Sequence, residues 1–189
     1  MTSRSLRIGV RRGASAVVFG VAMAASAIGC APGDAPSGAA PTAAPTTVLP
    51  TAGVAAAQTR GELARVLGER RLILTDAQRP FRPPEAPTLA ATPRAVYQVT
   101  LPADPDDGYI VVYELLDPNA AAAAATEQAA YLASGPGRIQ SPLGSIHVIR
   151  QVGSTVVLYS WLPEAAEDPN APEIQAALVT LGLGIPVPA

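Results

Sequence analysis

Prolines divide this chain into segments that can form regular structure and segments that cannot. Of its 20 prolines, five lie in residues 31–58 and five more in residues 79–93. Proline lacks the amide donor that helices and sheets need, and it restricts the residue before it to extended conformations. Helices and strands are therefore expected mainly from residue 59 to residue 182, interrupted by a proline-rich loop over 79–93.

The segment before this region is predicted to be a spacer. Residues 31–58 are rich in alanine, proline and threonine, carry a single charge at Asp34 and contain no aromatic residue. Such a composition cannot bury enough apolar surface to offset the entropy lost on ordering. We expect residues 30–58 to form a disordered stalk that separates the folded part from whatever holds the N-terminus.

The first thirty residues have the pattern of an export signal. Residues 1–12 are basic, residues 14–28 are uncharged and mostly apolar, and small residues surround Cys30. This order is typical of a secretory signal peptide. Ile28, Gly29 and Cys30 also resemble the lipobox of bacterial lipoproteins, although Ala27 stands where that family favours leucine.

The resemblance covers residues 1–30 alone. It implies that residues 1–29 are removed as a signal peptide and that Cys30 then carries acyl chains. Those chains would anchor the protein on the extracytoplasmic side of the cell membrane or the outer membrane, because each buried methylene contributes about 0.8 kcal/mol.

Two other interpretations of this segment stay open. Ordinary cleavage near Ala27 would release a soluble secreted protein. The uncharged run over residues 13–33 is long enough for an uncleaved membrane helix. Since Cys30 is the only cysteine, the chain has no internal disulfide in any of these cases.

The charge of the exported part disfavours one class of partner. From Cys30 onward the chain has nine arginines and fifteen acidic residues, a net charge of −6. Contact with nucleic-acid phosphates needs a basic face. We therefore expect no nucleic-acid partner.

Hydrophobic periodicity predicts one α+β domain over residues 59–182, followed by a tail over 183–189. The expected helices cover residues 60–69, 117–133 and 170–181, and the expected strands cover residues 72–74, 94–101, 109–116, 146–152 and 155–162. This order predicts an antiparallel or mixed sheet of about four to five strands with helices on one face. The central part of the pattern is similar to small uncharacterised exported proteins, which implies no activity and no site residues.

Three expected helix starts carry capping residues. Thr59 and Glu62 form a capping-box pattern, and Asn170 with Glu173 forms a second one. Asp117 followed by Pro118 is a favourable start for the central helix.

The last two predicted strands form a hairpin whose register can be derived. Gly153 and Ser154 fit a two-residue type II′ turn, which places His147 opposite Ser160. A serine–histidine pair suggests nucleophilic catalysis. However, side chains in the middle of a strand lack the exposed elbow of a nucleophile, and no third orienting group is evident. We interpret the pair as an ordinary cross-strand contact and assign no catalytic residue.

Other polar residues do not form a recognisable cofactor or metal site. Asp104, Asp106 and Asp107 suggest a calcium loop, but Leu115 stands where a helix–loop–helix site needs glutamate, so a solvated turn is expected. One histidine and one cysteine cannot build a zinc site. Glu114 interrupts an apolar strand and is expected at a strand edge or facing solvent.

The same hairpin register places Tyr159 opposite Val148 and Trp161 opposite Ile146, on the face away from His147. If helices cover only the His147 face, Tyr159 and Trp161 form an exposed surface for a protein or glycan partner. If helices cover the other face, these aromatic residues belong to the core.

Together these observations predict a membrane-tethered, non-catalytic binding or accessory module. The alternatives are a cell-envelope hydrolase with an unrecognised active site, built from Ser160 and His147 or from Glu114 and another acid, and a purely structural envelope protein.

Overall fold

The computed structural model describes residues 53–189, so the signal segment, Cys30 and most of the predicted stalk lie outside the described residues. Within residues 53–189 the chain forms a single α+β unit with five helices and a six-stranded sheet, which confirms the predicted fold class. The sheet has one strand more than the upper predicted number. No helix in this described part is long and apolar enough to cross a membrane.

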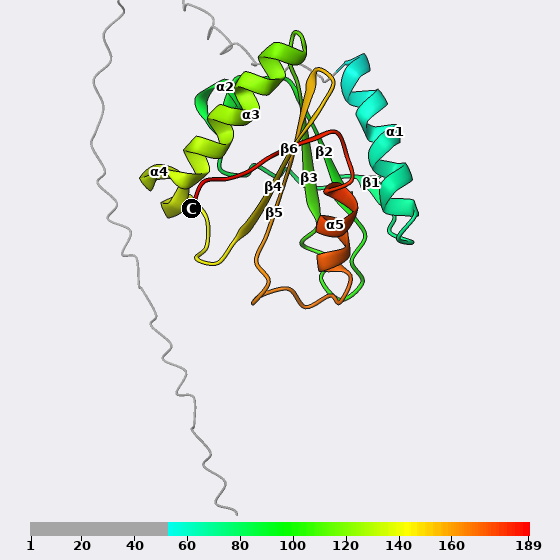
Figure 1. Ribbon diagram of the computed structural model, residues 1–189. Coiled ribbons are helices and arrows are strands. Elements are labelled where there is room, and N and C mark those ends of the chain that lie inside the picture. The colour runs from blue at the N-terminus through cyan, green and yellow to red at the C-terminus, as the bar shows by residue number, and fades with distance from the viewer. Residues whose placement is uncertain (1–52) are drawn as a thin grey trace, which may run out of the picture. The chain divides into compact units, whose positions relative to one another are not determined.

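Helices and strands alternate irregularly along the chain (Figure 1). The helices are α1 (Val54–Gly68), α2 (Pro87–Ala90), α3 (Pro118–Ala133), α4 (Gly135–Gln140) and α5 (Ala171–Leu178). The strands are β1 (Leu74–Asp76), β2 (Arg94–Val99), β3 (Tyr109–Glu114), β4 (Ile146–Val152), β5 (Thr155–Trp161) and β6 (Leu183–Ile185). The sheet order is β1-β2-β3-β5-β4-β6, and every neighbouring pair is antiparallel.

The β4–β5 hairpin has the predicted register. His147 pairs with Ser160, and Val152 pairs with Thr155 across the turn. Gly153 has a φ of 56°, whereas Ser154 has no positive φ, as a type II′ turn requires. The short loop thus fixes which side chains meet across the two strands.

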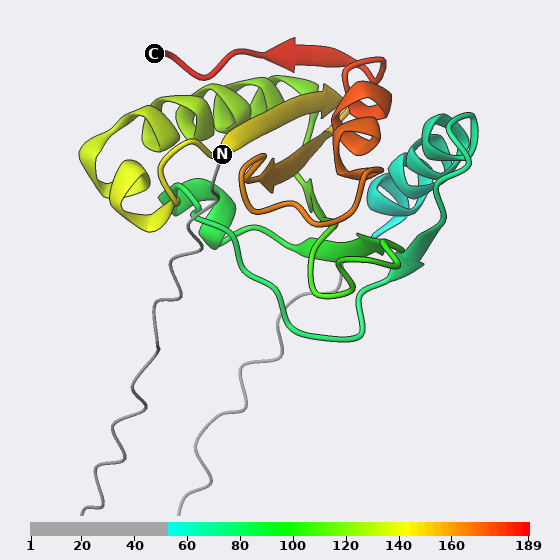
Figure 2. The same cartoon turned by 90° about the horizontal axis from the view of Figure 1, so that it is seen from below.

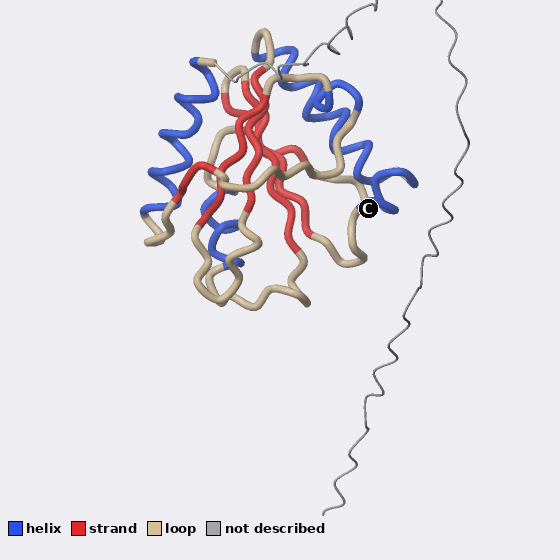
Figure 3. Tube along the Cα trace, turned by 180° about the vertical axis from the view of Figure 1, so that it is seen from behind, coloured by secondary structure: helices blue, strands red, loops and turns tan. Residues whose placement is uncertain are grey.

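Helices cover both faces of the sheet, so the prediction of helices on one face is wrong. Figure 1 and Figure 3 show α1 and α5 on one side of the strands and α2, α3 and α4 on the other. The physical reason lies in β3, where Ile110 and Val112 face α1 while Val111 and Tyr113 face α3, and all four are buried. A strand that is apolar on both faces needs cover on both.

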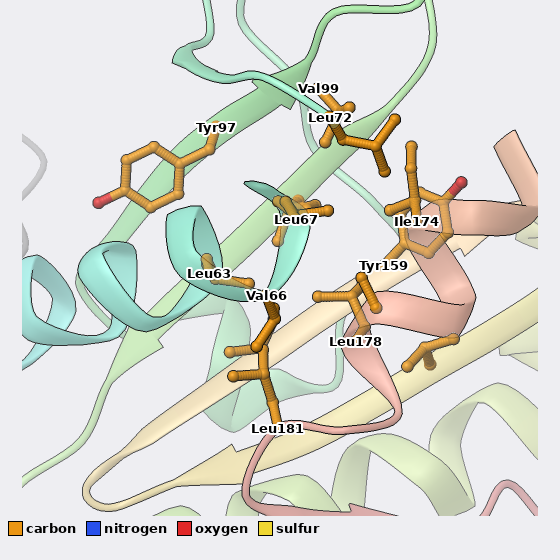
Figure 4. Packing of buried hydrophobic residues seen from close by; sticks show 14 of the residues in the cluster. Leu63, Val66, Leu67, Leu72, Tyr97, Val99, Tyr159, Ile174, Leu178 and Leu181 are labelled. Carbon is orange, nitrogen blue, oxygen red and sulfur yellow. The ribbon is translucent and has the colours of Figure 1, made fainter. Parts of the chain in front are cut away.

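The core beneath α1 and α5 is built from large aliphatic side chains (Figure 4). Leu63 and Leu67 of α1 meet Ile174 and Leu178 of α5 over the sheet, and all four are almost fully buried. Burying one such side chain contributes about 1.5–3 kcal/mol. The other face uses small residues instead: alanines of α3, including Ala121 and Ala125, pack on the sheet.

Helix α1 begins earlier than the sequence predicts. It starts at Val54, so the predicted stalk boundary at residue 58 falls inside a helix. Thr59 is not a cap: it is buried, and its hydroxyl lies 2.8 Å from the hydroxyl of Thr155. The cap comes from β3, where Glu114 Oε2 accepts from the amides of Gly53 at 2.7 Å and Ala56 at 3.0 Å.

The two other predicted caps have opposite outcomes. Asp117 accepts from the amides of Asn119 and Ala120, both at 2.8 Å, which confirms the predicted start of α3. Asn170 makes no side-chain cap. Asp168 instead accepts from the amide of Asn170 at 2.8 Å and from Ala103 at 2.9 Å. These two hydrogen bonds stabilise the Asp168 carboxylate and lower its pKa.

The predicted tail contains an edge strand. Leu183–Ile185 form β6, which pairs with β4 through Ile149, Arg150 and Gln151 (Figure 2). The chain turns at Gly182, where φ is positive, and Arg150 donates to the carbonyls of Leu181 at 2.6 Å and Gly182 at 2.9 Å. These side-chain contacts, which the local sequence does not reveal, hold the end of the chain on the sheet.

Candidate ligand pocket

Three side chains form a row across the central strands, on the face covered by α3. His147 of β4 pairs with Ser160 of β5. Ile110 pairs with Tyr159, so Tyr109 of β3 follows in register beside Ser160. The row therefore lies at the end of the sheet where β3 and β4 begin and β5 ends, beyond the part of the sheet that the alanines of α3 cover.

The serine and the histidine are in direct contact. His147 Nδ1 lies 2.7 Å from Ser160 Oγ, which makes the predicted cross-strand pair a hydrogen bond. Both side chains are half-buried. Burial lowers the pKa of His147 because desolvation disfavours the charged imidazolium. The pair thus presents neutral polar groups at neutral pH.

A cavity of about 350 Å³ opens over this pair, and we call it the His147 pocket. Its walls come from the proline-rich loop after β1, the end of α4 with the loop that follows, and the end of β5. Its apolar lining residues are Phe81, Pro83, Pro84, Pro142, Trp161, Leu162 and Ala165. Its polar lining residues are Arg82, Asp107, Gln140, Ser141, Ser145, His147 and Ser160.

Aromatic packing shapes one wall of the pocket. The ring of Phe81 stacks on that of Tyr109, with centroids 4.4 Å apart and the ring planes inclined by 5°. Tyr109 is buried, so Phe81 covers the start of β3 and faces the pocket in its place. Stacked pairs of this kind contribute about 0.5–1.5 kcal/mol beyond the area that they bury.

The structure bears on the two alternatives for the aromatic residues Tyr159 and Trp161, an exposed binding surface or a part of the core. Tyr159 is 2% exposed and belongs to the core under α5, so it follows the second alternative and cannot form part of an exposed binding surface. Trp161 is half-buried: its indole packs against the same core and donates from Nε1 to Gln175 Oε1 at 3.0 Å, and the residue borders the His147 pocket at the end of β5. This outcome follows from the position of α5, which covers the face that the prediction left open.

A second cavity adjoins the first one. It has a volume of about 390 Å³ and shares Arg82, Pro83, Pro84 and Gln140 with the His147 pocket. Its remaining lining residue is Glu85, whose side chain is 2% exposed. We call it the Arg82 cavity.

Glu85 is the centre of a polar network that the sequence did not reveal. Its carboxylate accepts from Arg82 Nε at 2.8 Å, from an Nη of Arg94 at 2.7 Å and from the hydroxyl of Tyr113 at 2.7 Å. Burial and the hydrogen bond to Glu85 raise the pKa of Tyr113 well above its usual value. The only feature of the sequence that pointed to this network was the spacing of Arg82 and Glu85, an arginine and an acid three residues apart in a proline-rich loop.

Gln128 of α3 fixes the loop that carries this network. Its side chain is fully buried, accepts from the amide of Ala86 at 2.7 Å and donates to the carbonyl of Pro84 at 2.8 Å. These bonds satisfy backbone groups that the prolines leave unpaired. The predicted loop over 79–93 is therefore held in place, and it also includes the short helix α2.

The remaining polar candidates lie apart from this network. Glu114 caps α1. Asp106 pairs with Arg79 in the turn before β3. Asp107 lies at the rim of the pocket, where partial desolvation and the neighbouring carboxylates of Asp104 and Asp106 raise its pKa. Across residues 53–189 no three acidic, histidine or cysteine side chains gather as a metal site would require.

The pocket can hold a small molecule by shape and by hydrogen bonding. Its apolar walls suit a hydrocarbon body, and the His147–Ser160 pair offers both a donor and an acceptor. The residue Ser141 also lines the pocket, but its Oγ is buried and makes no hydrogen bond within residues 53–189.

No protein-family model, curated protein sequence or solved structure matches this chain. The assignment of the site therefore depends on the geometry described above.

Proposed function

We propose that this chain is an extracytoplasmic lipoprotein, anchored through lipid on Cys30, whose folded domain binds a small and largely apolar ligand in the His147 pocket. The signal-like order of residues 1–30 supports the anchor. The observation that carries the binding role is the pocket of about 350 Å³ with apolar walls and a neutral histidine–serine pair. Ligand sites typically combine these two features.

The size of the pocket favours a small molecule over a protein or glycan surface. Cavities of about 300–1,000 Å³ are the usual range for small-molecule sites. Of the aromatic pair predicted from sequence, only Trp161 contributes here, as part of a pocket wall.

A hydrolase is the second candidate, and the 2.7 Å contact between His147 and Ser160 is the observation that favours it. A serine nucleophile also needs a group that orients the histidine and donors for the oxyanion. Within residues 53–189, the only hydrogen bond formed by the His147 ring is the one to Ser160, so no carboxylate orients it. The pair therefore supports ligand binding better than nucleophilic attack.

The hydrolase candidate has a direct test. If Ser160 is a nucleophile, the wild-type protein hydrolyses p-nitrophenyl acetate faster than the Ser160→Ala variant. Equal rates for the two proteins are the result expected for a binding module.

The binding role can be tested by isothermal titration calorimetry. We expect cyclohexanecarboxamide to give a saturable heat of binding. Ala165→Phe should abolish this response because the larger side chain fills the pocket. Ala123→Phe, at an exposed position on α3 outside the pocket, is the matched control and should bind like wild type. A response that is absent in wild type, or unchanged in Ala165→Phe, would contradict the proposal.

A further inference from the structure

Arg82 stands where the His147 pocket meets the Arg82 cavity, and it lines both. Its Nε donates to Glu85 Oε2 at 2.8 Å. Its two Nη nitrogens make no hydrogen bond within residues 53–189, and its side chain is 62% exposed. One edge of the guanidinium is thus hydrogen bonded to Glu85, and its two Nη nitrogens can still donate to a ligand.

The attachment fixes the orientation of the guanidinium. Glu85 is buried, and three donors from Arg82, Arg94 and Tyr113 satisfy its two oxygens. A buried carboxylate with this many partners has little freedom to move. Arg82 is therefore held in position before any ligand arrives, which reduces the entropy that binding would cost.

The charge balance of the network favours an anion. Two arginines surround one carboxylate, so the cluster of Arg82, Arg94 and Glu85 keeps one positive charge. The carboxylate of Asp107 lines the other part of the same pocket. Its negative charge opposes a ligand with several negative charges more than a ligand with one.

The free edge of a guanidinium matches one anionic group especially well. Its parallel N–H donors fit the two oxygens of a planar carboxylate, and the pair is stronger than a neutral hydrogen bond. We propose that Arg82 binds the carboxylate of the ligand, which makes that ligand a small apolar monocarboxylate. This inference rests on the proposed function, because the body of the ligand would occupy the His147 pocket.

Two probes that differ only in charge test this inference. Cyclohexanecarboxylate and cyclohexanecarboxamide have the same body and nearly the same shape. At pH 7 and low salt we expect the carboxylate to bind about tenfold more tightly than the amide, as measured by isothermal titration calorimetry. Added salt should weaken the binding of the carboxylate alone.

Substitutions assign the difference to one residue. Arg82→Gln should remove the preference for the carboxylate, so that the two probes bind to this variant with equal affinity. Arg65→Gln is the matched control, because Arg65 is equally exposed, at 63%, and lies on α1. If Arg82→Gln fails to fold, Arg82→Lys serves in its place. Lysine keeps the positive charge but lacks the paired N–H donors of the guanidinium, so this variant should retain only part of the preference for the carboxylate.

The outcomes separate the two proposals. Equal affinities for the two probes would overturn the carboxylate site while leaving the pocket intact. A preference that survives Arg82→Gln would overturn the role of Arg82. Binding of neither probe would contradict the pocket and the carboxylate site together.

Discussion

Glu114 at the end of β3 caps the helix that begins beside Gly53, 61 positions earlier in the chain. One carboxylate oxygen accepts the amides of Gly53 and Ala56, two of the donors that the first turn of a helix leaves unpaired. The negative charge also lies at the positive end of the helix dipole. This contact joins the start of the described domain to its central strands.

Loss of this cap should destabilise the domain. We expect Glu114→Ala to lower the free energy of unfolding by about 1 kcal/mol, the usual cost of removing a helix cap. Urea denaturation followed by circular dichroism measures this change. Glu114→Gln is the control, because its amide oxygen can still accept, and it should lose less. Equal stability of Glu114→Ala and wild type would show that the cap does not contribute.

Parts of this fold could be predicted because their signals are local. The Gly153–Ser154 turn fixes the β4–β5 register, and Asp117 with Pro118 marks the start of α3. The start of α1 could not be predicted in this way, because its cap comes from Glu114 rather than from Thr59.

The candidate site was predictable only in part, for the same reason. The contact between His147 and Ser160 followed from the hairpin register. The pocket above it needs the loops around Phe81 and Pro142, which approach each other only in the folded chain. The network of Glu85 likewise depends on Tyr113 and Arg94, which lie on two other strands.

The burial of His147 should make stability depend on pH. Its pKa in the folded protein lies below the usual value of 6.5. Well above pH 6.5 the imidazole of His147 is neutral in both the folded and the unfolded state, so His147 does not reduce the free energy of unfolding. As the pH falls below 6.5, the unfolded state binds a proton that the folded state resists, so the free energy of unfolding decreases.

A variant isolates this effect from other groups. Asp107 has a raised pKa, and its protonation at lower pH favours the folded state, which opposes the effect of His147. His147→Gln retains a side chain that can hydrogen bond to Ser160 and does not titrate. We expect the stability of wild type relative to His147→Gln to fall between pH 7.5 and pH 5.5. A constant difference across that range would contradict the buried neutral state of His147.

The end of the chain should contribute to stability because it forms β6. Removal of residues 183–189 deletes the pairing with β4 and the packing of Ile185 and Val187 on the core. We expect a loss of roughly 2 kcal/mol from this burial, measured as a lower urea midpoint. A chain that ends at Val187 is the control, since it lacks only the exposed Pro188 and Ala189. Equal midpoints for the two shortened chains would restore the interpretation of this segment as a tail.

The proposed lipid anchor makes a prediction for the full chain. Cys30→Ala removes the thiol that would carry the acyl chains, so the protein should leave the membrane fraction on centrifugation of cell extracts. Cys30→Ser should behave in the same way, because a hydroxyl does not replace the modified thiol. If either variant sediments with membranes as wild type does, lipid on Cys30 is not the anchor.

The most direct test of the central claim is a two-dimensional ¹H–¹⁵N NMR titration of the protein with cyclohexanecarboxamide. The claim is that the domain binds a small apolar ligand in the His147 pocket. We predict saturable shifts at the amides of Ser145, His147 and Ser160, with β1 at the far edge of the sheet unaffected. Shifts confined to other surfaces, or no saturable shifts at all, would contradict the claim.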